Sequence, residues 1–171
     1  MKHVVALTFN IGLFLAIICT ISTLAGGYAY FTSSGNLSEP TTVFIKEGSS
    51  LKTISAKLAS QHVIDYPTLF STIVRTTKQS SSLKAGEYHF DAHVTPRDVY
   101  RKIATGDVVL HQLTIAEGLT SHQIANIIMS TANLTGEITQ LPKEGSLLPE
   151  TYAYHHAEKR QNIINRMQHA M

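Results

Sequence analysis

Apolar residues are unevenly distributed along the chain, and the longest apolar stretch comes first. Residues 4–31 contain no charged side chain, and Asn10 is the one poorly tolerated polar residue among them. The stretch exceeds the ~20 residues that a helix needs to cross a bilayer. The pattern therefore predicts a short N-terminal segment and a transmembrane helix within residues 1–31.

The flanks of this helix indicate its orientation. Lys2, His3 and the free amino group precede it, and no other Lys or Arg occurs before Lys46. Positive charge is retained on the cytoplasmic side of a membrane, so we expect a cytoplasmic N-terminus and an extracytoplasmic remainder. A cleaved signal peptide is the alternative, because MKH is a short basic start and STLAGG offers small residues for cleavage. We favour an uncleaved anchor, since the apolar run exceeds the roughly 7–15 residues usual in a signal peptide.

Beyond a polar linker at residues 32–42, short apolar strands alternate with amphipathic helices. We expect strands at 43–45, 87–90 and 108–115 and a loop at 78–82. Helices should follow Ser49 or Ser50, Asp65 and Thr95, because Ser, Thr and an early Pro are favoured at helix starts. This order, β-α-α-β-α and then β-α, predicts an α+β fold.

The predicted inner faces of these helices are apolar. They comprise Leu51, Ile54 and Leu58, then Leu69, Phe70, Ile73 and Val74, then Val99, Tyr100 and Ile103. Residues 141–154, with two prolines and a glycine, are expected to form an ordered loop. A last helix is expected at 157–171, with Ile163, Ile164, Met167 and Met171 on one face. That face is expected to have little left to pack against.

One phrase occurs twice, 70 residues apart. IKEGSS at 45–50 parallels IAEGLT at 115–120, and apolar helix positions follow each at equivalent spacing. A sharp turn from strand to helix explains the glycines, because glycine tolerates a positive φ there. Two such phrases indicate two related modules. Glu47 and Glu117 stand at helix starts, where the helix dipole alone explains an acidic residue.

Composition removes several classes of function. The 14 Lys and Arg residues nearly balance 12 Asp and Glu, whereas a nucleic-acid binder needs a basic surplus, so we expect no nucleic-acid partner. The single cysteine, Cys19, excludes a disulfide framework and a cysteine-based zinc site. A cysteine-free region beyond the anchor suits an oxidising compartment.

Histidines are the candidates for metal binding. Residues four apart on a strand point the same way, so His89 and His93 are a geometrically allowed pair. No third ligand stands at a sensible spacing, and solvated surface histidines are the better interpretation. We therefore predict no metal site and no cofactor. Tyr88 and Tyr100 are expected to be core residues with solvated hydroxyls.

Three stretches of the sequence resemble a known family. They are FIKEGSSLKTISAKL (44–58), LKAGEYHF with TPRDVYRKIATGDV (83–90 and 95–108), and LTIAEGLTSHQIANII with EGSLLPETYAY (113–128 and 144–154). The first resembles the opening of a LysM module, which binds N-acetylglucosamine-containing glycans. Together they resemble the membrane-anchored endolytic murein transglycosylases, also called YceG-like, whose EGxLxPxTYxF phrase is the most specific signal.

This resemblance implies a domain plan. Residues 43–110 would form a LysM-like module, and residues 111–171 would form the beginning of a transglycosylase catalytic domain. The location implied is the bacterial inner (plasma) membrane, with a single pass and a periplasmic bulk. The implied partners are peptidoglycan glycan strands and cell wall synthases. Tyr152 and Tyr154, with Glu144 of the same phrase, are the implied glycan-binding residues, because their loop borders the substrate cleft of the family.

The implied activity is that of a lyase in cell wall biogenesis. Such enzymes cleave MurNAc-GlcNAc bonds within a strand, leave 1,6-anhydroMurNAc ends and terminate nascent glycan strands. The catalytic glutamate of the family lies in an Ile/Val-Glu-Lys-Glu phrase, which does not occur in this sequence. We therefore carry over no catalytic residue and expect a truncated, inactive enzyme. The alternative is an anchored, non-catalytic peptidoglycan-binding protein.

Overall fold

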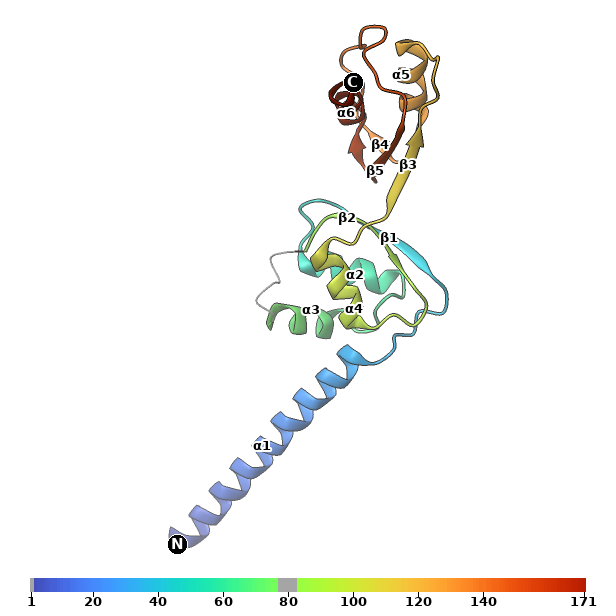
Figure 1. The fold of residues 1–171 in the computed structure, drawn as a ribbon. Helices are drawn as coiled ribbons and strands as arrows, with labels where there is room; N and C mark the ends of the chain where they lie inside the picture. Colours follow the sequence, from blue (N-terminus) through green and yellow to red (C-terminus); the bar gives the residue numbers. More distant parts are fainter. Residues whose placement is uncertain (1, 77–82) are drawn as a thin grey trace. The chain divides into compact units, whose positions relative to one another are not determined.

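The computed structural model describes residues 2–76 and 83–171, and the predicted loop at 78–82 lies outside the described residues. The chain contains both helices and strands (Figure 1), which confirms the predicted α+β fold. The chain forms two compact units. The first comprises Met1–Thr41, Ser50–Leu83 and Phe90–Ala104, and the second comprises Thr42–Ser49, Lys84–His89 and Thr105–Met171. The bounds 43–110 and 111–171 stay a prediction.

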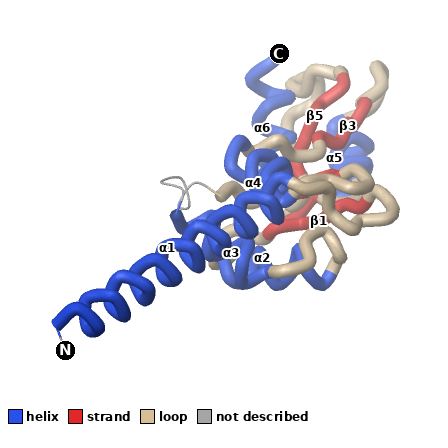
Figure 2. Tube along the Cα trace, turned by 90° about the horizontal axis from the view of Figure 1, so that it is seen from below, coloured by secondary structure: helices blue, strands red, loops and turns tan. Residues whose placement is uncertain are grey.

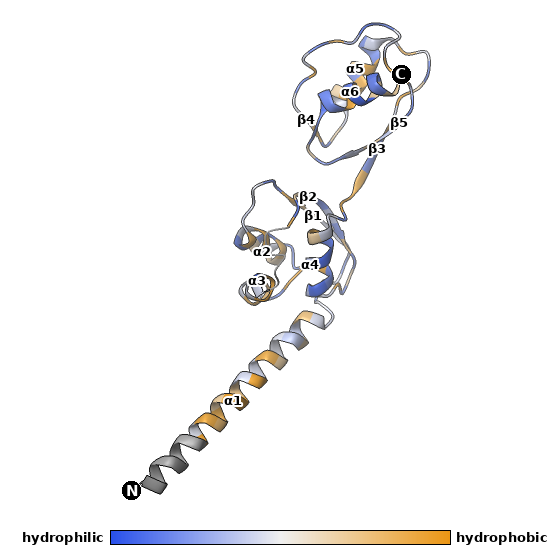
Figure 3. Ribbon diagram, turned by 60° about the vertical axis from the view of Figure 1, so that its left-hand side comes forward, coloured by the Kyte–Doolittle hydropathy of each residue, from blue (hydrophilic) through white to orange (hydrophobic). Residues whose placement is uncertain are grey.

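The N-terminal apolar stretch forms one long helix, α1 (Lys2–Thr32). Within it, Ile11–Thr32 has a mean hydropathy of 1.9, visible as the run of orange residues in Figure 3. These 22 residues span about 33 Å at 1.5 Å per residue, against about 30 Å of bilayer hydrocarbon. α1 is therefore long and apolar enough to cross a membrane, a test that a signal sequence also passes.

Aromatic residues end this helix within the first unit. The ring of Phe31 lies 6.4 Å from those of both Phe70 and Tyr100, between centroids. Tyr30 lies 5.4 Å from Tyr66 in an edge-on arrangement, and its hydroxyl accepts a hydrogen bond from the Tyr66 N–H. Tyr30 and Phe31 thus pack against other residues of the first unit.

The first unit contains α2 (Leu51–Ser60) and α3 (Pro67–Thr76), followed by α4 (Pro96–Thr105). The predicted cap Thr95 accepts a hydrogen bond from the Asp98 N–H and donates one to its carboxylate. The buried apolar residues of this unit are Leu37, Ile54, Leu58, Val63, Ile64, Phe70, Val74, Phe90, Val99 and Ile103. Leu69 is 37% exposed, so its predicted place on the inner face is wrong.

Three pairs of strands complete the fold of the described residues. β1 (Thr41–Ile45) pairs with β2 (Gly86–Phe90), and β4 (Leu134–Thr135) pairs in parallel with β6 (Glu158–Lys159). β3 (Leu110–Thr114) pairs antiparallel with β5 (Thr151–His155), and both figures show them side by side (Figures 1 and 2). Residues 151–154 of β5 lie within the stretch predicted to be a loop, so that part of the prediction is wrong.

The second unit has its own apolar core between α5 (Ser121–Ser130) and α6 (Arg160–Ala170). Its buried members are Leu113, Ile115, Ile124, Ile128, Leu134, Leu147, Tyr152, Tyr154, Ile163, Ile164 and Met167. The face of α6 is therefore packed, contrary to the expectation that it had little to pack against. Met171, by contrast, is 68% exposed and follows the helix rather than joining its buried face.

Candidate functional site

Both Glu-Gly phrases form the same turn between a strand and a capped helix. Gly48 has a φ of 75° and Gly118 a φ of 80°, in the left-handed region that glycine adopts without a Cβ penalty. Ser50 and Thr120 then cap α2 and α5, since each side-chain oxygen accepts a hydrogen bond from the backbone N–H three residues later. Related local sequence has produced related local structure.

A pocket of about 580 Å³ opens beside the first of these turns, within the second unit. Its lining combines an aromatic ring, aliphatic groups and three charged side chains. The lining residues include Phe44, Lys46, Glu47, Lys84, Val108 and His156. Its volume lies in the range of small-ligand sites, about 300–1,000 Å³.

In one wall of this pocket, the lack of a side chain at Gly86 lets the backbone lie close to Val108. Gly86 has a φ of 148°, and a Cβ added there would come within 2.4 Å of the Val108 side chain. The ammonium of Lys84 is held in turn, because it donates a hydrogen bond of 2.9 Å to the carbonyl of Thr105. The pocket thus presents a fixed apolar wall with a positioned cation, which suits a polar molecule with an apolar face.

Glu144, the first of the predicted glycan-binding residues, contacts the start of α5. Its carboxylate accepts a hydrogen bond of 3.0 Å from the backbone N–H of Ser121, whose hydroxyl donates to the carbonyl of Lys143. An acidic group is stabilised there by the unpaired N–H groups and the dipole of the helix. Glu144 therefore ties the loop that carries it to a helix N-terminus.

Tyr152 and Tyr154, the other two predicted residues, lie on β5 with their side chains in the core. They are 7% and 6% exposed. The Tyr152 hydroxyl donates to the carbonyl of Leu148 at 2.8 Å, and the Tyr154 hydroxyl donates to that of Ala132 at 3.2 Å. Both hydroxyls thus have structural partners, and glycan binding by these two residues and Glu144 stays a prediction.

The histidine pair weighed from the sequence does not share a strand. β2 ends at Phe90, and His93 follows in a turn with a φ of 59°. His89 remains on β2, where its Nδ1 lies 3.3 Å from the Thr42 hydroxyl. The premise of a common strand direction is therefore wrong.

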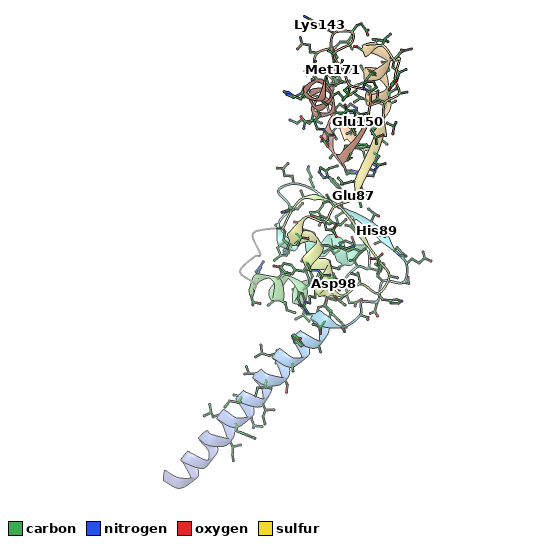
Figure 4. All side chains as sticks on the ribbon, in the orientation of Figure 1. Glu87, His89, Asp98, Lys143, Glu150 and Met171 are labelled. Atoms are coloured by element: carbon green, nitrogen blue, oxygen red, sulfur yellow. The ribbon has the colours of Figure 1, made fainter. Side chains whose placement is uncertain are left out.

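The structure brings together a different group of possible metal ligands, Glu87, His111 and His156. Glu87 lies on β2 (Figure 4), His111 on β3, and His156 directly after β5. One potential ligand atom from each lies within 4.8 Å of the other two. No local sequence pattern indicates this group, because Glu87 and His111 are 24 positions apart. The antiparallel pairing of β3 with β5 brings His156 close to His111.

The described chain thus defines an α+β protein with one N-terminal helix of membrane-spanning length. The sequence profile of the YceG-like family matches residues 43–171. A chain matched over that extent belongs to the YceG-like family.

Solved structures similar to this chain include that of a putative YceG-like protein from Listeria monocytogenes. The two share 26% sequence identity with a TM-score of 0.46, over 78% of this chain and 54% of that one. The chain therefore spans about half the length of this solved relative. A search of curated proteins gives no match.

Proposed function

We propose that this chain serves peptidoglycan strand cleavage at the outer face of the plasma membrane. In this proposal it provides the anchor, the glycan-recognition region and the first part of the catalytic domain of an endolytic lytic transglycosylase. The observation that carries the proposal is membership of the YceG-like family over residues 43–171. The apolar helix α1 supports the anchored location.

The proposed reaction breaks the β-1,4 bond between MurNAc and GlcNAc inside a strand. A carboxylic acid protonates the glycosidic oxygen, and the resulting carboxylate then takes the proton from the MurNAc 6-hydroxyl. That oxygen attacks the anomeric carbon and forms the 1,6-anhydro bond, so no water is consumed. One carboxyl group suffices because the substrate supplies its own nucleophile, unlike the paired carboxylates of hydrolases. We assign this carboxyl group to none of the residues described here.

The pocket beside the first Glu-Gly turn is the proposed glycan subsite. A sugar ring has an apolar face and a rim of hydroxyl groups. The Phe44 and Val108 side chains offer apolar surface, while Lys46 and Glu47 offer charged hydrogen-bonding groups. This pairing of surfaces supports the recognition of a sugar.

Sedimentation with insoluble murein tests this subsite, using the full chain in detergent micelles. We expect binding by the wild type and weaker binding by Glu47→Gln and Lys46→Gln. Glu117→Gln is the matched control, because Glu117 holds the equivalent position in the second phrase. Unchanged sedimentation of both pocket variants, with the control also unchanged, would remove the pocket from the proposal.

Incubation with purified murein tests the reaction. We expect the 171-residue chain to release no anhydro-muropeptides, because it has no Ile/Val-Glu-Lys-Glu phrase. Reading the coding DNA beyond Met171 separates the two hypotheses left by the sequence. An in-frame glutamate phrase, with cleavage by that product, supports the transglycosylase. A stop codon there, with murein binding alone, supports the non-catalytic binding protein.

Reporter fusions test the location. A periplasm-active phosphatase fused after Met171 should be active, and a cytoplasm-active galactosidase fused there should be inactive. The reverse result would overturn the extracytoplasmic placement.

Crosslinking in membranes tests the proposed contact with cell wall synthases.

A further inference from the structure

We propose that Glu87, His111 and His156 bind one divalent transition-metal ion, with Zn²⁺ as the first candidate. The three residues lie in the second unit, on β2, on β3 and directly after β5. His156 also lines the pocket proposed as the glycan subsite, but metal binding by the three residues does not depend on that proposal.

The interatomic distances lie close to those expected around a shared cation. Glu87 Oε2 lies 2.6 Å from His111 Nε2 and 3.6 Å from His156 Nδ1. Two ligand atoms bound to one zinc ion at about 2.0–2.1 Å are separated by roughly 3–4 Å. Without an ion, Glu87 and His111 form a hydrogen bond. Lengthening the Oε2–Nε2 distance by less than about 1 Å would bring these two atoms to the separation of ligands on one zinc ion.

The donor set selects the class of metal. Two imidazole nitrogens and one carboxylate oxygen suit Zn²⁺ and its first-row neighbours, whereas Mg²⁺ and Ca²⁺ prefer oxygen ligands throughout. Three protein ligands leave a coordination position for water or a further group. The side chains of Glu87, His111 and His156 are 16%, 26% and 26% exposed, so the ligands are sheltered and still reachable by solvent.

An unsatisfied atom supports the assignment. His156 Nδ1 is buried and has no hydrogen-bond partner among the described residues. A buried polar atom without a partner is costly and calls for an explanation such as an ion. The Glu87–His111 hydrogen bond leaves that atom unsatisfied, since Glu87 Oε2 lies 3.6 Å from it, whereas coordination uses its lone pair.

Packing holds the two imidazole rings in place. The ring of His111 stacks on Tyr154 at 5.4 Å between centroids, and that of His156 lies against Phe44 at 4.2 Å. The carbonyl of Glu87 accepts a hydrogen bond of 2.7 Å from the Val109 N–H, which joins β2 to the residues before β3. The ligands are thus positioned before any ion arrives, as a specific site requires.

The position of the site indicates its effect. Its ligands come from three segments that are distant in the sequence, so a bound ion cross-links them. An ion that binds the folded chain and not the unfolded one raises stability in proportion to its affinity. We therefore assign the ion a structural role in the second unit.

Zinc titration of the full chain in detergent micelles, against a fluorescent chelator, tests the proposal. We expect one Zn²⁺ per chain and affinity more than about tenfold weaker in Glu87→Gln, His111→Gln and His156→Gln. His155→Gln is the matched control, because the exposed His155 is the immediate neighbour of His156, and its affinity should equal that of the wild type. Equal affinity in all four variants, or no binding by the wild type, overturns the proposal.

Two further measurements guard against variants that fail to fold. Added Zn²⁺ should raise the thermal midpoint of the wild type and His155→Gln, but not that of His156→Gln, with metal-free circular dichroism as the check on folding. The wild type with Co²⁺ should show the visible bands of a four- or five-coordinate ion with nitrogen ligands. A purely octahedral aqua spectrum for wild-type Co²⁺ overturns the site without reference to any variant.

Discussion

The β1–α2 and β3–α5 segments follow one backbone plan in two settings. Residues 41–50 and 111–120 show nearly the same order of buried and exposed positions, with alternate strand residues buried and the Glu-Gly turn exposed. Each segment ends in a capped helix with buried apolar residues. These are Ile54 and Leu58 in α2 and their equivalents Ile124 and Ile128 in α5. The comparison shows that a short sequence motif produces the same strand, turn and helix start in both settings.

The likeness extends to the strand that each segment pairs with. β2 and β5 each bury a tyrosine, Tyr88 and Tyr152, followed two positions later by a buried aromatic residue. Each tyrosine hydroxyl donates a hydrogen bond of 2.8 Å to the carbonyl four residues earlier, that of Lys84 or Leu148. The repeat recognised in the sequence therefore includes its tyrosine-bearing partner strands.

The difference lies at the first helical residue. α2 begins with the half-buried Leu51, whereas α5 begins with Ser121, which is 3% exposed and bonded through its N–H and hydroxyl to the loop at Lys143 and Glu144. The equivalent position is thus apolar in α2 and polar in α5, and the polar residue binds a neighbouring loop.

The largest effect is expected when a core side chain is truncated at equivalent positions of α2 and α5. Leu58 and Ile128 are both fully buried, so Leu58→Ala and Ile128→Ala should each lower the free energy of unfolding by about 2–5 kcal/mol. Urea unfolding in detergent, followed by far-ultraviolet circular dichroism, measures the loss. A loss below about 1 kcal/mol in one variant alone would break the equivalence of the two helices.

Alanine at the two turn glycines tests the shared backbone. A Cβ at Gly48 or Gly118 meets no atom within 4 Å, so the cost is the left-handed conformation itself, about 1–2 kcal/mol each. Asn tolerates that conformation better, so Gly48→Asn and Gly118→Asn should lose less. Equal stability of the alanine and asparagine variants in urea unfolding would show that strain is not the reason for glycine.

Phenylalanine at the two tyrosines tests the partner strands. Tyr88→Phe and Tyr152→Phe should each cost about 1 kcal/mol, because a part-buried carbonyl loses its hydrogen-bond donor. Denaturant unfolding at neutral pH gives this value. A neutral effect for Tyr152→Phe alone would show that the resemblance of β2 and β5 is only geometric.

The pKa values of the same two tyrosines are raised in the folded chain, which predicts a loss of stability at alkaline pH. Burial, with a smaller effect of Asp107, raises the pKa of Tyr88 to about 12. Burial and then Glu150 also raise the pKa of Tyr152, which Arg166 partly offsets. A raised folded-state pKa gives stability that is present below the unfolded value of about 10 and is lost as pH rises through the folded value. Between pH 10 and 12, Tyr88→Phe should therefore lose less stability than the wild type, which thermal unfolding across that range measures. An identical loss of stability in the wild type and in Tyr88→Phe would contradict the raised pKa of Tyr88.

The smallest expected effect concerns the caps. Ser50→Ala and Thr120→Ala should each cost about 0.5–1 kcal/mol. Thr120→Ala should cost more, because Gln123 also accepts from the Thr120 N–H and completes a capping box. Amide hydrogen exchange over the first turn of each helix reports the difference. Faster exchange at α2 than at α5 after these substitutions would reverse the comparison.

Much of the fold was predictable from local pattern. The order of elements from β1 to α5, the cap at Thr95 and the two Glu-Gly turns are confirmed, because periodicity, capping and glycine conformations act within a few residues. Strand β5 was missed, because prolines and glycine nearby indicate a loop, whereas its pairing with β3 comes from a distant segment. The burial of Ile163 and Ile164 was missed for the same reason.

The candidate sites divide along the same line. The EGSLLPETYAY phrase was found by sequence, yet the contacts of Glu144 with Ser121 and of Tyr154 with Ala132 required the folded chain. The Glu87, His111 and His156 group had no sequence signal at all. Strand pairing brings its members together, and the residues adjacent to each one form no motif that predicts the other two.

The sequence by itself determined the apolar helix, the repeated strand–turn–helix plan and the family, because each depends on short-range pattern or motif. The tertiary structure alone decided which side chains meet: the core position of Tyr152 and Tyr154, the docking of the loop on α5, and the convergence of three ligand-type residues. The physical reason is that conformational preferences act over a few residues, whereas a core or a ligand cluster depends on contacts between segments far apart in the chain.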